Sequence, residues 1–315
     1  MSKVGTSIEE AARILSEGGL VAIPTETVYG LAANAFNEEA ITKIFEVKNR
    51  PAFDPLITHI ANSSQLAPLV TDIPSNTRKL INQFWPGPLT VVLPKDNLLS
   101  DLITSGLPTA AFRVPNHPIT QKLLSTVNFP LVAPSANPFT YVSPTTAQHV
   151  EDQLGEKVDY ILDGGPCSVG LESTIVSFKN NATQILRLGG LSIEEIEQII
   201  GKTDIQTHSS SQPEAPGMLT SHYSPGIPIY IGVIDKLLIE KSDKKIGIIS
   251  YKKTYPNYIN SVLAPTGNLP QAAQNLFKAL RWMDDQKVEI ILSEWVPNHG
   301  LGRAINDRLK RAAST

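Results

Sequence analysis

The sequence predicts an α/β protein of two parts, and three features of the chain lead to this prediction. Short apolar segments of strand length alternate with segments of helical periodicity up to about residue 205. The segment 206–227 is rich in Ser and Pro and has no apolar periodicity, which is typical of a linker. A shorter α/β pattern follows at 228–315. The first part, 1–205, is therefore expected to form a mixed, open sheet with helices.

Local signals give the expected boundaries of the first helices. Ser7 and Glu10 have the spacing of a capping box, so a helix is expected to start there. A second helix is expected from Asn37 and must end by Arg50, because Pro51 disfavours helical geometry in the residue before it. Further helices are expected at 76–84, 119–126, 146–154, 193–200, 271–283 and 301–312. Strands are expected at 20–23, 56–60, 89–93, 110–114, 160–162, 174–178, 184–188, 229–233, 246–250 and 288–292.

The composition indicates an ordinary globular protein. Of the 315 residues, 41% are apolar and 18% are charged, which is enough apolar material for a sizeable core. No apolar run approaches the roughly 18 residues of a membrane span, and residues 1–10 lack the apolar core of a secretory signal. The single cysteine, Cys167, rules out an internal disulfide and argues against a structural zinc site. We therefore expect a cytoplasmic protein with no membrane contact.

The charge balance bears on the kind of partner. The formal net charge is -3, whereas proteins that hold a long RNA by its phosphates usually carry a basic excess. A small-molecule substrate is therefore favoured, and stable nucleic-acid binding is not expected.

The common nucleotide-binding motifs are missing from the sequence. Gly165 and Gly170 have the spacing of a P-loop, but Leu171 and Glu172 stand where Lys and Ser or Thr are needed. No G-x-G-x-x-G follows a predicted strand, and neither a zincin helix nor a nucleophile elbow is present. Any use of ATP must therefore depend on another kind of site.

Basic residues next to the predicted strands indicate an anion-binding cleft. Lys48, Arg50, Arg113 and Arg187 all lie at or near ends of predicted elements, where ligands bind in open α/β sheets. Phosphates and carboxylates both favour such a lining. Taken singly, Lys48 and Arg50 also fit a helix end, where basic residues complement the helix dipole. Likewise, His59 alone fits a core histidine.

Arg113 has the most specific environment of these residues. It lies within an apolar strand, so it is expected to be buried only with an anionic partner. Its planar fork suits a carboxylate, which is either that of Glu26, that of Glu172 or that of a substrate.

Eight segments together resemble the YrdC-type threonylcarbamoyl-AMP synthases. They occur in the order typical of that family and span almost the whole first part. They are IPTETVYGL at 23–31, KNRPAFDPLITHI at 48–60, PGPLTVVL at 86–93, AFRVPNHP at 111–118, APSANPF at 133–139, SPTT at 143–146, GLESTIV at 170–176 and ILRLGG at 185–190. The segment PGMLTSHYSP at 216–225 is similar to the linker of the long form of the family. The resemblance implies a YrdC-like domain at 1–205, a linker or lid at 206–227 and a small Rossmann-like domain at 228–315.

The resemblance implies a specific reaction. L-threonine, bicarbonate and ATP would give L-threonylcarbamoyladenylate and pyrophosphate, with Mg²⁺ arriving together with the ATP. A separate transferase complex would then use the product to modify an adenosine of transfer RNA.

Roles for individual residues also follow from the resemblance. Catalytic roles fall on Lys48, Arg50, Ser135 and Asn137. Contacts to ATP fall on Arg50, Asp54, Thr109, Ser135, Ser143, Arg187 and Tyr223. Contacts to threonine fall on Thr27, His59, Arg113, Ala133 and Ser173. No residue is assigned to a metal.

Two other functions fit the same segments. One is a module of the same fold that binds nucleotide or RNA and does not make the adenylate. The intact KNR and SAN sequences and the slightly acidic charge argue against it. The other is a carbamoyl-transfer domain like those of larger maturation proteins. It is disfavoured because no acylphosphatase or zinc-finger segment is seen.

Overall fold

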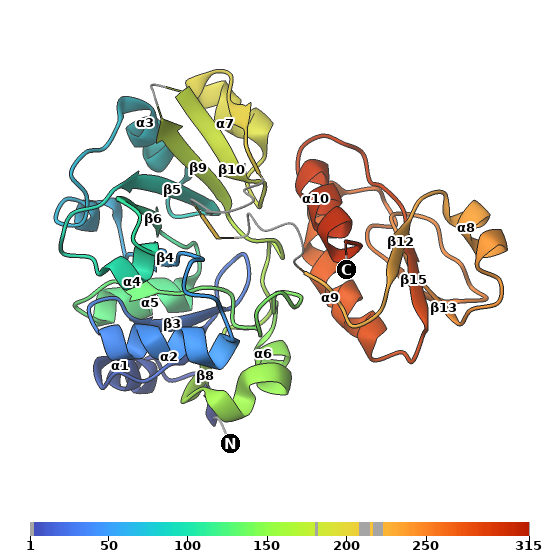
Figure 1. Ribbon diagram of the computed structural model, residues 1–315, viewed down its shortest axis with the longest axis horizontal. Helices are drawn as coiled ribbons and strands as arrows, with labels where there is room; N and C mark the ends of the chain where they lie inside the picture. Colours follow the sequence, from blue (N-terminus) through green and yellow to red (C-terminus); the bar gives the residue numbers. More distant parts are fainter. Residues whose placement is uncertain (1–2, 180–181, 208–214, 217–222, 315) are drawn as a thin grey trace.

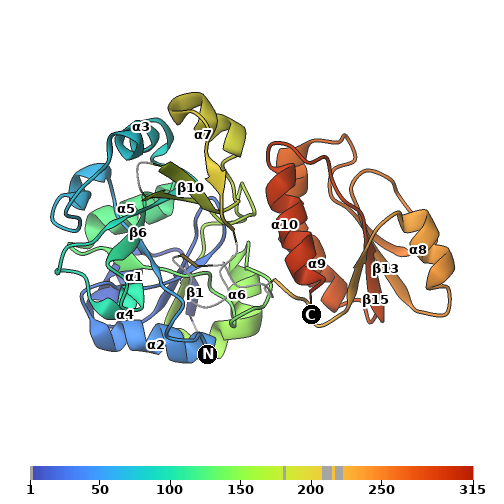
Figure 2. The ribbon, with the colours of Figure 1, turned by 45° about the horizontal axis from the view of Figure 1, so that its top comes forward.

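The computed structural model describes residues 3–179, 182–207, 215–216 and 223–314. These residues form two α/β lobes that lie side by side, as the two views in Figures 1 and 2 agree. The N-terminal lobe, coloured blue to yellow, is built on a large sheet, and the C-terminal lobe, orange to red, on a smaller one. Within the described ranges the large sheet has 11 strands and the small sheet has 4. The two-part α/β prediction is therefore confirmed.

The large sheet mixes parallel and antiparallel pairs. Its strands are β1 (Lys3–Gly5), β2 (Val21–Ile23), β3 (Gly30–Asn34), β4 (Ile57–His59), β5 (Leu89–Pro94), β6 (Thr109–Arg113), β7 (Leu131–Val132), β8 (Tyr160–Leu162), β9 (Thr174–Lys179), β10 (Ala182–Arg187) and β11 (Asp204–Ile205). Their spatial order is β1-β8-β2-β3-β7-β4-β6-β5-β9-β10-β11. For example, β4 runs parallel to β6, whereas β5 runs antiparallel to β6. The large sheet extends to Ile205, since β11 pairs with β10.

Helices cover both faces of this sheet. They are α1 (Ile8–Ser16), α2 (Glu38–Lys48), α3 (Ser75–Phe84), α4 (Asp101–Thr104), α5 (Pro118–Thr126), α6 (Ala147–Leu154) and α7 (Ile193–Ile200), with short 3₁₀ turns η1 (Ser63–Leu66) and η2 (Gly155–Lys157). Alternate side chains of a strand point to opposite faces. In β2, Ala22 packs in the core under α2, α3, α6 and α7, whereas Val21 and Ile23 pack in the core under α1 and α5. Such a strand therefore contributes side chains to two cores, which explains why its sequence is a continuous apolar run.

The expected capping box of α1 is only half formed. The Ser7 hydroxyl accepts a hydrogen bond from the Glu10 amide at 3.1 Å, as expected. The Glu10 carboxylate, however, pairs with Arg13 at 3.0 Å, and the Ser7 amide donates to the hydroxyl of Tyr160. A complete capping box forms instead at the start of α7. The tertiary contact with Tyr160 therefore replaces the second local hydrogen bond.

The second predicted helix ends where its sequence indicated. Asn37 caps α2 through its side chain, and Asn49 ends the helix in the left-handed conformation at φ 50°. The chain leaves the helix there, directly before Arg50 and Pro51. This geometry sets the direction from which Arg50 enters the protein interior.

The C-terminal lobe is a parallel α/β unit. Its strands β12 (Ile229–Ile231), β13 (Ile246–Ser250), β14 (Ile259–Val262) and β15 (Ile290–Ser293) lie in the order β12-β15-β13-β14. Its helices are α8 (Ile234–Glu240), α9 (Leu269–Asp284) and α10 (Gly302–Ala312). In Figures 1 and 2, α9 and α10 lie between this sheet and the N-terminal lobe. Their core continues across the boundary, because Val28, Val142 and Leu171 of the N-terminal lobe pack in it.

Several short elements were not predicted from the sequence. They are β1, β3, β11, β14, α4 and α8. The strand β3 reads GLAAN, whose small residues have a low strand propensity, and β11 has only two residues. These strands form because they pair with neighbouring strands, so no local sequence signal marks them.

Most of the expected linker, 206–227, lies outside the described residues, with 206–207, 215–216 and 223–227 inside. Among the helices of the described ranges, none is long and apolar enough to cross a membrane.

The two helix caps give a stability prediction. Ser7→Ala and Ser192→Ala should each lower the free energy of unfolding by about 1 kcal/mol, because each removes an acceptor for a helix amide. Ser192→Ala should cost more, since Ser192 is buried and its hydroxyl donates to Glu195 at 2.5 Å, whereas Ser7 is exposed and donates to Glu9 at 3.2 Å. Denaturant unfolding measures both effects. As a control, Ser125→Ala within α5 should cost nothing, because alanine is the better helix former. An equal loss in Ser125→Ala would contradict the assignment to capping.

Candidate active site

A small cavity lies where loops of the large sheet meet the segment that leads to the C-terminal lobe. Its volume is about 50 Å³. Ile57 and His59, two residues apart in β4, both face it, as alternate residues of a strand must. It is lined by Thr27, Val28, Arg50, Ile57, His59, Arg113, Ala133, Pro134, Ser135, Glu172, Ser173, Arg187, Pro216 and Tyr223. Thus Arg113 and Arg187, the last residues of β6 and β10, come together with loops far apart in the sequence.

Arg50 is anchored through its own loop. Its Nη2 lies 2.9 Å from a carboxylate oxygen of Asp54 and donates to the Pro55 carbonyl at 2.8 Å. Its Nε donates to the backbone carbonyl of Asp54. The proline after Arg50 ends α2 and forces the chain into this turn. Asp54 therefore balances the charge of Arg50 behind the cavity and does not itself line it.

Arg113 pairs with Glu26. Its Nη2 lies 2.7 Å from Glu26 Oε1, and its Nε donates to the Gly87 carbonyl at 3.4 Å. Among the described residues, the two carboxylate oxygens of Glu26 have no partner in hydrogen-bond geometry, and the same holds for the Nη2 of Arg113. Of the three partners that the sequence left open, the structure places Glu26 against Arg113. The incomplete bonding leaves the guanidinium able to receive a further carboxylate.

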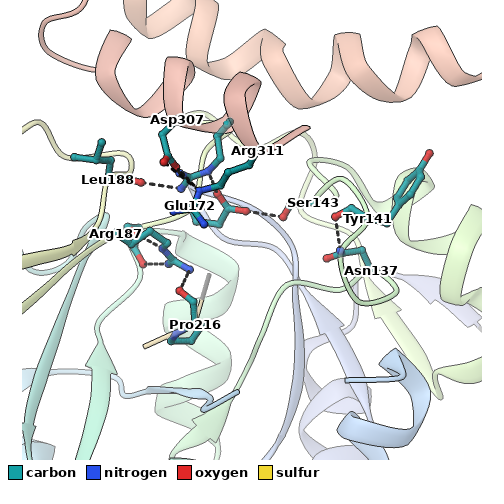
Figure 3. Close-up of polar contacts among 11 residues, drawn as sticks. Asn137, Tyr141, Ser143, Glu172, Arg187, Leu188, Pro216, Asp307 and Arg311 are labelled. Atoms are coloured by element: carbon teal, nitrogen blue, oxygen red, sulfur yellow. Dashed lines mark hydrogen bonds and ion pairs between the residues drawn. The ribbon is translucent and has the colours of Figure 1, made fainter. Parts of the chain in front are cut away.

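Arg187 contacts both Ser173 and the segment between the lobes. Its Nε and Nη2 donate to the carbonyl and hydroxyl oxygens of Ser173, both at 3.0 Å. Its Nη1 donates to the Pro216 carbonyl at 3.4 Å, as Figure 3 shows. The Ser173 hydroxyl in turn contacts Thr90 at 2.7 Å. These contacts hold Arg187 at the cavity wall and tie Pro216 to it.

His59 is a neutral imidazole in this site. Burial, followed by the charge of Arg113, lowers its pKa to about 3. Its Nδ1 lies 3.2 Å from the Ile57 carbonyl, which can only accept, so Nδ1 carries the proton. Nε2 is therefore an acceptor, suited to a hydroxyl or ammonium donor.

Lys48 and Asn137 lie behind the cavity and hold the loop that carries Ser135. The Lys48 ammonium donates to the backbone carbonyls of Ser135 and Asn137, and only 1% of the residue is exposed. Burial, followed by the charge of Arg50, lowers the Lys48 pKa well below its usual value. The Asn137 amide nitrogen donates to the carbonyls of Pro138 and Tyr141, both at 2.9 Å, and Figure 3 shows the contact with Tyr141. Lys48 is thus placed to act on a substrate through the position of Ser135 rather than from the cavity wall.

Glu172 was considered in the sequence only as a mismatch to a P-loop and as a partner of Arg113. In the structure it lines the cavity and pairs with Arg308 of α10 at 3.0 Å. Its other oxygen accepts a hydrogen bond from the Ser143 hydroxyl at 2.6 Å (Figure 3). Burial raises its pKa, but the charges of Arg308 and Arg187 and the Ser143 hydroxyl lower it to about 2. Glu172 is therefore ionised, and no local signal could have identified Arg308 as its partner.

The structure brings most of the expected site residues together. Those that line the cavity are Thr27, Arg50, His59, Arg113, Ala133, Ser135, Ser173, Arg187 and Tyr223. Lys48, Asp54, Asn137 and Ser143 lie behind it and contact its walls or the loops that form them. Lining residues that the sequence did not indicate are Val28, Ile57, Pro134, Glu172 and Pro216.

Thr109 is placed differently from the other expected nucleotide contacts. It begins β6, where it pairs with Pro94, whereas Arg113 ends the same strand. They are four positions apart in an extended strand, or about 13 Å. Thr109 does not line the cavity, so the structure does not bring it together with Arg50 and Ser135.

Acidic residues near the cavity form no metal cage. Among the described residues, no group of three or more His, Cys, Asp or Glu side chains is placed to hold a metal ion. Asp54, Glu26 and Glu172 each face a guanidinium instead. The protein side of the site therefore offers mainly positive charge, and a metal ion would need ligands from the substrate.

These features define an α/β protein whose buried, cationic cavity is suited to phosphate and carboxylate groups. Two family models match the chain: one described as "Telomere recombination" over residues 13–189, and one described as "Threonylcarbamoyl-AMP synthase, C-terminal domain" over residues 191–314. The threonylcarbamoyl-AMP synthase of Pyrococcus abyssi is 43% identical over 97% of this chain and 94% of its own length. That of Bacillus subtilis is 40% identical over 97% of this chain and 92% of its own length. The chain belongs to the threonylcarbamoyl-AMP synthase family.

A solved structure agrees with this assignment. The crystal structure of P. abyssi Sua5 complexed with L-threonine matches with a TM-score of 0.92 at 40% identity. The match covers 99% of this chain and 97% of that chain, so both lobes are shared. The family resemblance that the sequence motifs indicated is confirmed.

The neutral state of His59 gives a prediction on pH. Because its pKa is about 3 and not 6.5, His59 does not titrate in the neutral range. Threonine affinity, measured by calorimetry, should therefore change less than about two-fold between roughly pH 5.5 and 7.5. His59→Phe should weaken threonine binding by about ten-fold, the loss of one hydrogen bond to a charged group. A clear step in affinity near pH 6.5 that disappears in His59→Phe would contradict the neutral assignment.

Proposed function

We propose that the chain makes L-threonylcarbamoyladenylate and pyrophosphate from L-threonine, bicarbonate and ATP. One observation carries this proposal: Arg50, Arg113 and Arg187 line one cavity, and Glu172, the only carboxylate among the described residues that line it, already pairs with Arg308. The excess positive charge suits a substrate set with a carboxylate and a triphosphate. The names of the relatives, and the L-threonine in the P. abyssi complex, support the same reaction.

Threonine is proposed to bind at the side of the cavity formed by Arg113 and His59. The guanidinium of Arg113, which is only partly bonded to Glu26, would take the α-carboxylate. The acceptor Nε2 of His59 would accept a hydrogen bond from the hydroxyl or the amine. Thr27, Ala133 and Ser173 complete the expected set of threonine contacts.

The nucleotide is proposed to bind on the side of Arg50 and Arg187. Both guanidiniums reach the cavity while their other nitrogens are held by carbonyl oxygens. Ser135 lines the same cavity, and Lys48 fixes its loop. Tyr223 would contact the nucleotide from the segment between the lobes.

The reaction balances in two steps. The threonine nitrogen adds to the carbon of bicarbonate and water leaves, which gives a carbamate. A carbamate oxygen then attacks the α-phosphorus of ATP, the bond to the bridging oxygen breaks, and pyrophosphate leaves. Fixed guanidiniums stabilise the charge that develops on the phosphate oxygens, and little covalent work is required of the protein. Exclusion of water protects the carbamate, which breaks down in solution.

We propose that the site opens to admit its substrates, and the small size of the cavity supports this. A volume of about 50 Å³ is far below the several hundred Å³ of typical small-molecule sites. Pro216 and Tyr223, from the segment between the lobes, form part of its wall. These two residues are therefore proposed to move apart from the sheet when ATP enters and to close over it afterwards.

Mg²⁺ is proposed to enter with ATP. The carboxylates near the cavity are paired with arginines, so the oxygen ligands that Mg²⁺ prefers would come chiefly from the phosphates and water. When bound, the ion would reduce the negative charge of the triphosphate. Arg50 and Arg187 would hold the remaining phosphate charge.

The product is proposed to pass to a separate transferase complex that modifies an adenosine of transfer RNA. An adenylate of a carbamate is an activated acyl donor, so a group-transfer reaction must consume it. The location in the cytoplasm and the lack of stable nucleic-acid binding remain predictions from composition alone.

Pyrophosphate release tests the proposed function. Purified protein with Mg²⁺, ATP, bicarbonate and threonine should release pyrophosphate only when all are present. Mass spectrometry should find the adenylate with one carbon from labelled bicarbonate. Binding of ATP without threonine-dependent pyrophosphate would favour the alternative of a nucleotide-binding module.

The proposed roles of Arg50 and Lys48 give a kinetic prediction. Arg50→Ala should lower kcat/KM by about 100-fold or more, because a fixed charge near the transition state is lost. Lys48→Ala should cause a similar loss, since Ser135 is no longer held in place. Arg78→Ala, at an exposed position of α3, is the control and should keep full activity. Near-normal turnover in Arg50→Ala or in Lys48→Ala would exclude that residue from a role in the reaction.

Selectivity against serine gives a further prediction. Serine lacks only the methyl group of threonine, and such a contact contributes about 1–3 kcal/mol. The apolar residues Ile57 and Ala133 of the lining can provide it. Serine should therefore be a detectable substrate with kcat/KM lower by about 10-fold to 200-fold. Equal efficiency for both amino acids would show that the cavity does not recognise the methyl group.

A further inference from the structure

Arg308 of α10 reaches from the C-terminal lobe into the wall of the cavity. Its side chain is fully buried, and its three nitrogens are all engaged. Nε donates to Glu172 Oε2 at 3.0 Å, and Nη2 donates to the Leu188 carbonyl at 2.7 Å. Nη1 pairs with its neighbour Asp307 at 2.6 Å (Figure 3 shows Glu172, Leu188 and Asp307). Two of these contacts cross from one lobe to the other.

The flat face of the same guanidinium covers Tyr223. The central carbon of the Arg308 guanidinium lies 4.7 Å from the centre of the Tyr223 ring. Phe277 of α9 stacks on that ring, with centroids 5.4 Å apart and planes inclined by 23°. The ring of Tyr223, which lines the cavity, is therefore held by two side chains of the C-terminal lobe.

A second arginine of the C-terminal lobe holds the neighbouring wall. Arg281 of α9 donates to the carbonyls of Val142 and Ser143. The hydroxyl of Ser143 then donates to the carboxylate of Glu172, which Arg308 holds from the other side. The contacts of α9 and α10 thus converge on Glu172 and Tyr223, and both of these residues line the cavity.

We propose that Arg308 is a positioning residue for the synthase reaction, through which the C-terminal lobe completes the nucleotide side of the cavity. It does so by fixing the ring of Tyr223 and the carboxylate of Glu172 in one arrangement. This inference rests on the proposed function. It gives the C-terminal lobe a role in the site, because Arg308 contacts both Tyr223 and Glu172.

The guanidinium is suited to this task in a way that a lysine is not. Its nitrogens donate in one plane, to Glu172 and Leu188, while its face lies against an aromatic ring. A lysine ammonium can pair with Glu172 but cannot also cover the ring and reach the carbonyl. Arg308→Lys should therefore keep the charge and lose the arrangement.

The test compares variants of the full chain by ATP affinity, by KM for each substrate and by kcat. Arg308→Met alone would leave the buried Glu172 carboxylate unpaired and can unfold the protein. The main variant is therefore Arg308→Met combined with Glu172→Gln, with Glu172→Gln alone as its reference. Arg303→Met is the matched control: Arg303 also lies on α10 and pairs across the lobes with Glu194 at 3.3 Å, away from the cavity.

The expected result is a selective loss on the nucleotide side. Relative to Glu172→Gln, the double variant should raise the KM and the dissociation constant of ATP by about ten-fold or more, with a smaller change for threonine. Arg308→Lys should show the same direction and should not restore ATP affinity. Phe277→Leu, which removes the stacked ring and keeps all charges, should also weaken the binding of ATP. Arg303→Met should leave the KM and the affinity for both substrates unchanged.

Two outcomes would overturn the inference. One is an ATP affinity in the double variant equal to that of Glu172→Gln. The other is an equal loss in Arg303→Met, which would show that any weakening of the lobe contact has this effect. The proposed function is judged separately from pyrophosphate release. If the wild-type protein binds ATP but releases no pyrophosphate, the proposed function is wrong, and the ATP affinity of the variants still decides the role of Arg308. Wild-type protein that does not bind ATP would overturn both.

Discussion

The burial of positive charge at one place is the constraint on which the rest of the site depends. Arg50, Arg113, Arg187 and Arg308 are each at most 8% exposed, and an unpaired guanidinium at such depth is strongly destabilising. Their main side-chain partners are Asp54, Glu26, Ser173 and Glu172, respectively. The loops that supply these partners are therefore fixed by the arginines. The charge that remains unbalanced at the cavity is the part that an anionic substrate can neutralise.

The same constraint connects the two lobes. Glu172 needs a cation because it is buried, and Arg308 of the C-terminal lobe provides it. Apolar contacts act in the same direction, since Val28, Leu171 and Tyr223 pack in the core formed by α9 and α10. The C-terminal lobe is thus held against the cavity both by a buried ion pair and by burial of apolar surface. Its position and the shape of the cavity are coupled.

Much of the fold followed from local signals, and the failures have a common cause. The boundaries of α2 were predicted from Asn37 and Pro51, because caps and proline act within a few residues. The second hydrogen bond of the capping box of α1 does not form because the Ser7 amide donates to Tyr160, far along the chain. Strands such as β3 and β11 were missed because only their neighbours stabilise them. The nucleotide contact expected of Thr109 stays a prediction, with Thr109 at the start of β6 and Arg113 at its end.

By itself, the sequence determined the chemical groups of the site: basic residues, hydroxyls and the loops that carry them, in motifs specific enough to indicate the family. It did so because a motif of adjacent residues is a local property of the chain. The tertiary structure decided which of these groups line the cavity and which hold it from behind, as with Arg50 and Lys48. It also decided that Glu172 pairs with Arg308, which is 136 positions away and in the other lobe. Such a pair leaves no local pattern, because it is selected by burial when the two lobes pack together.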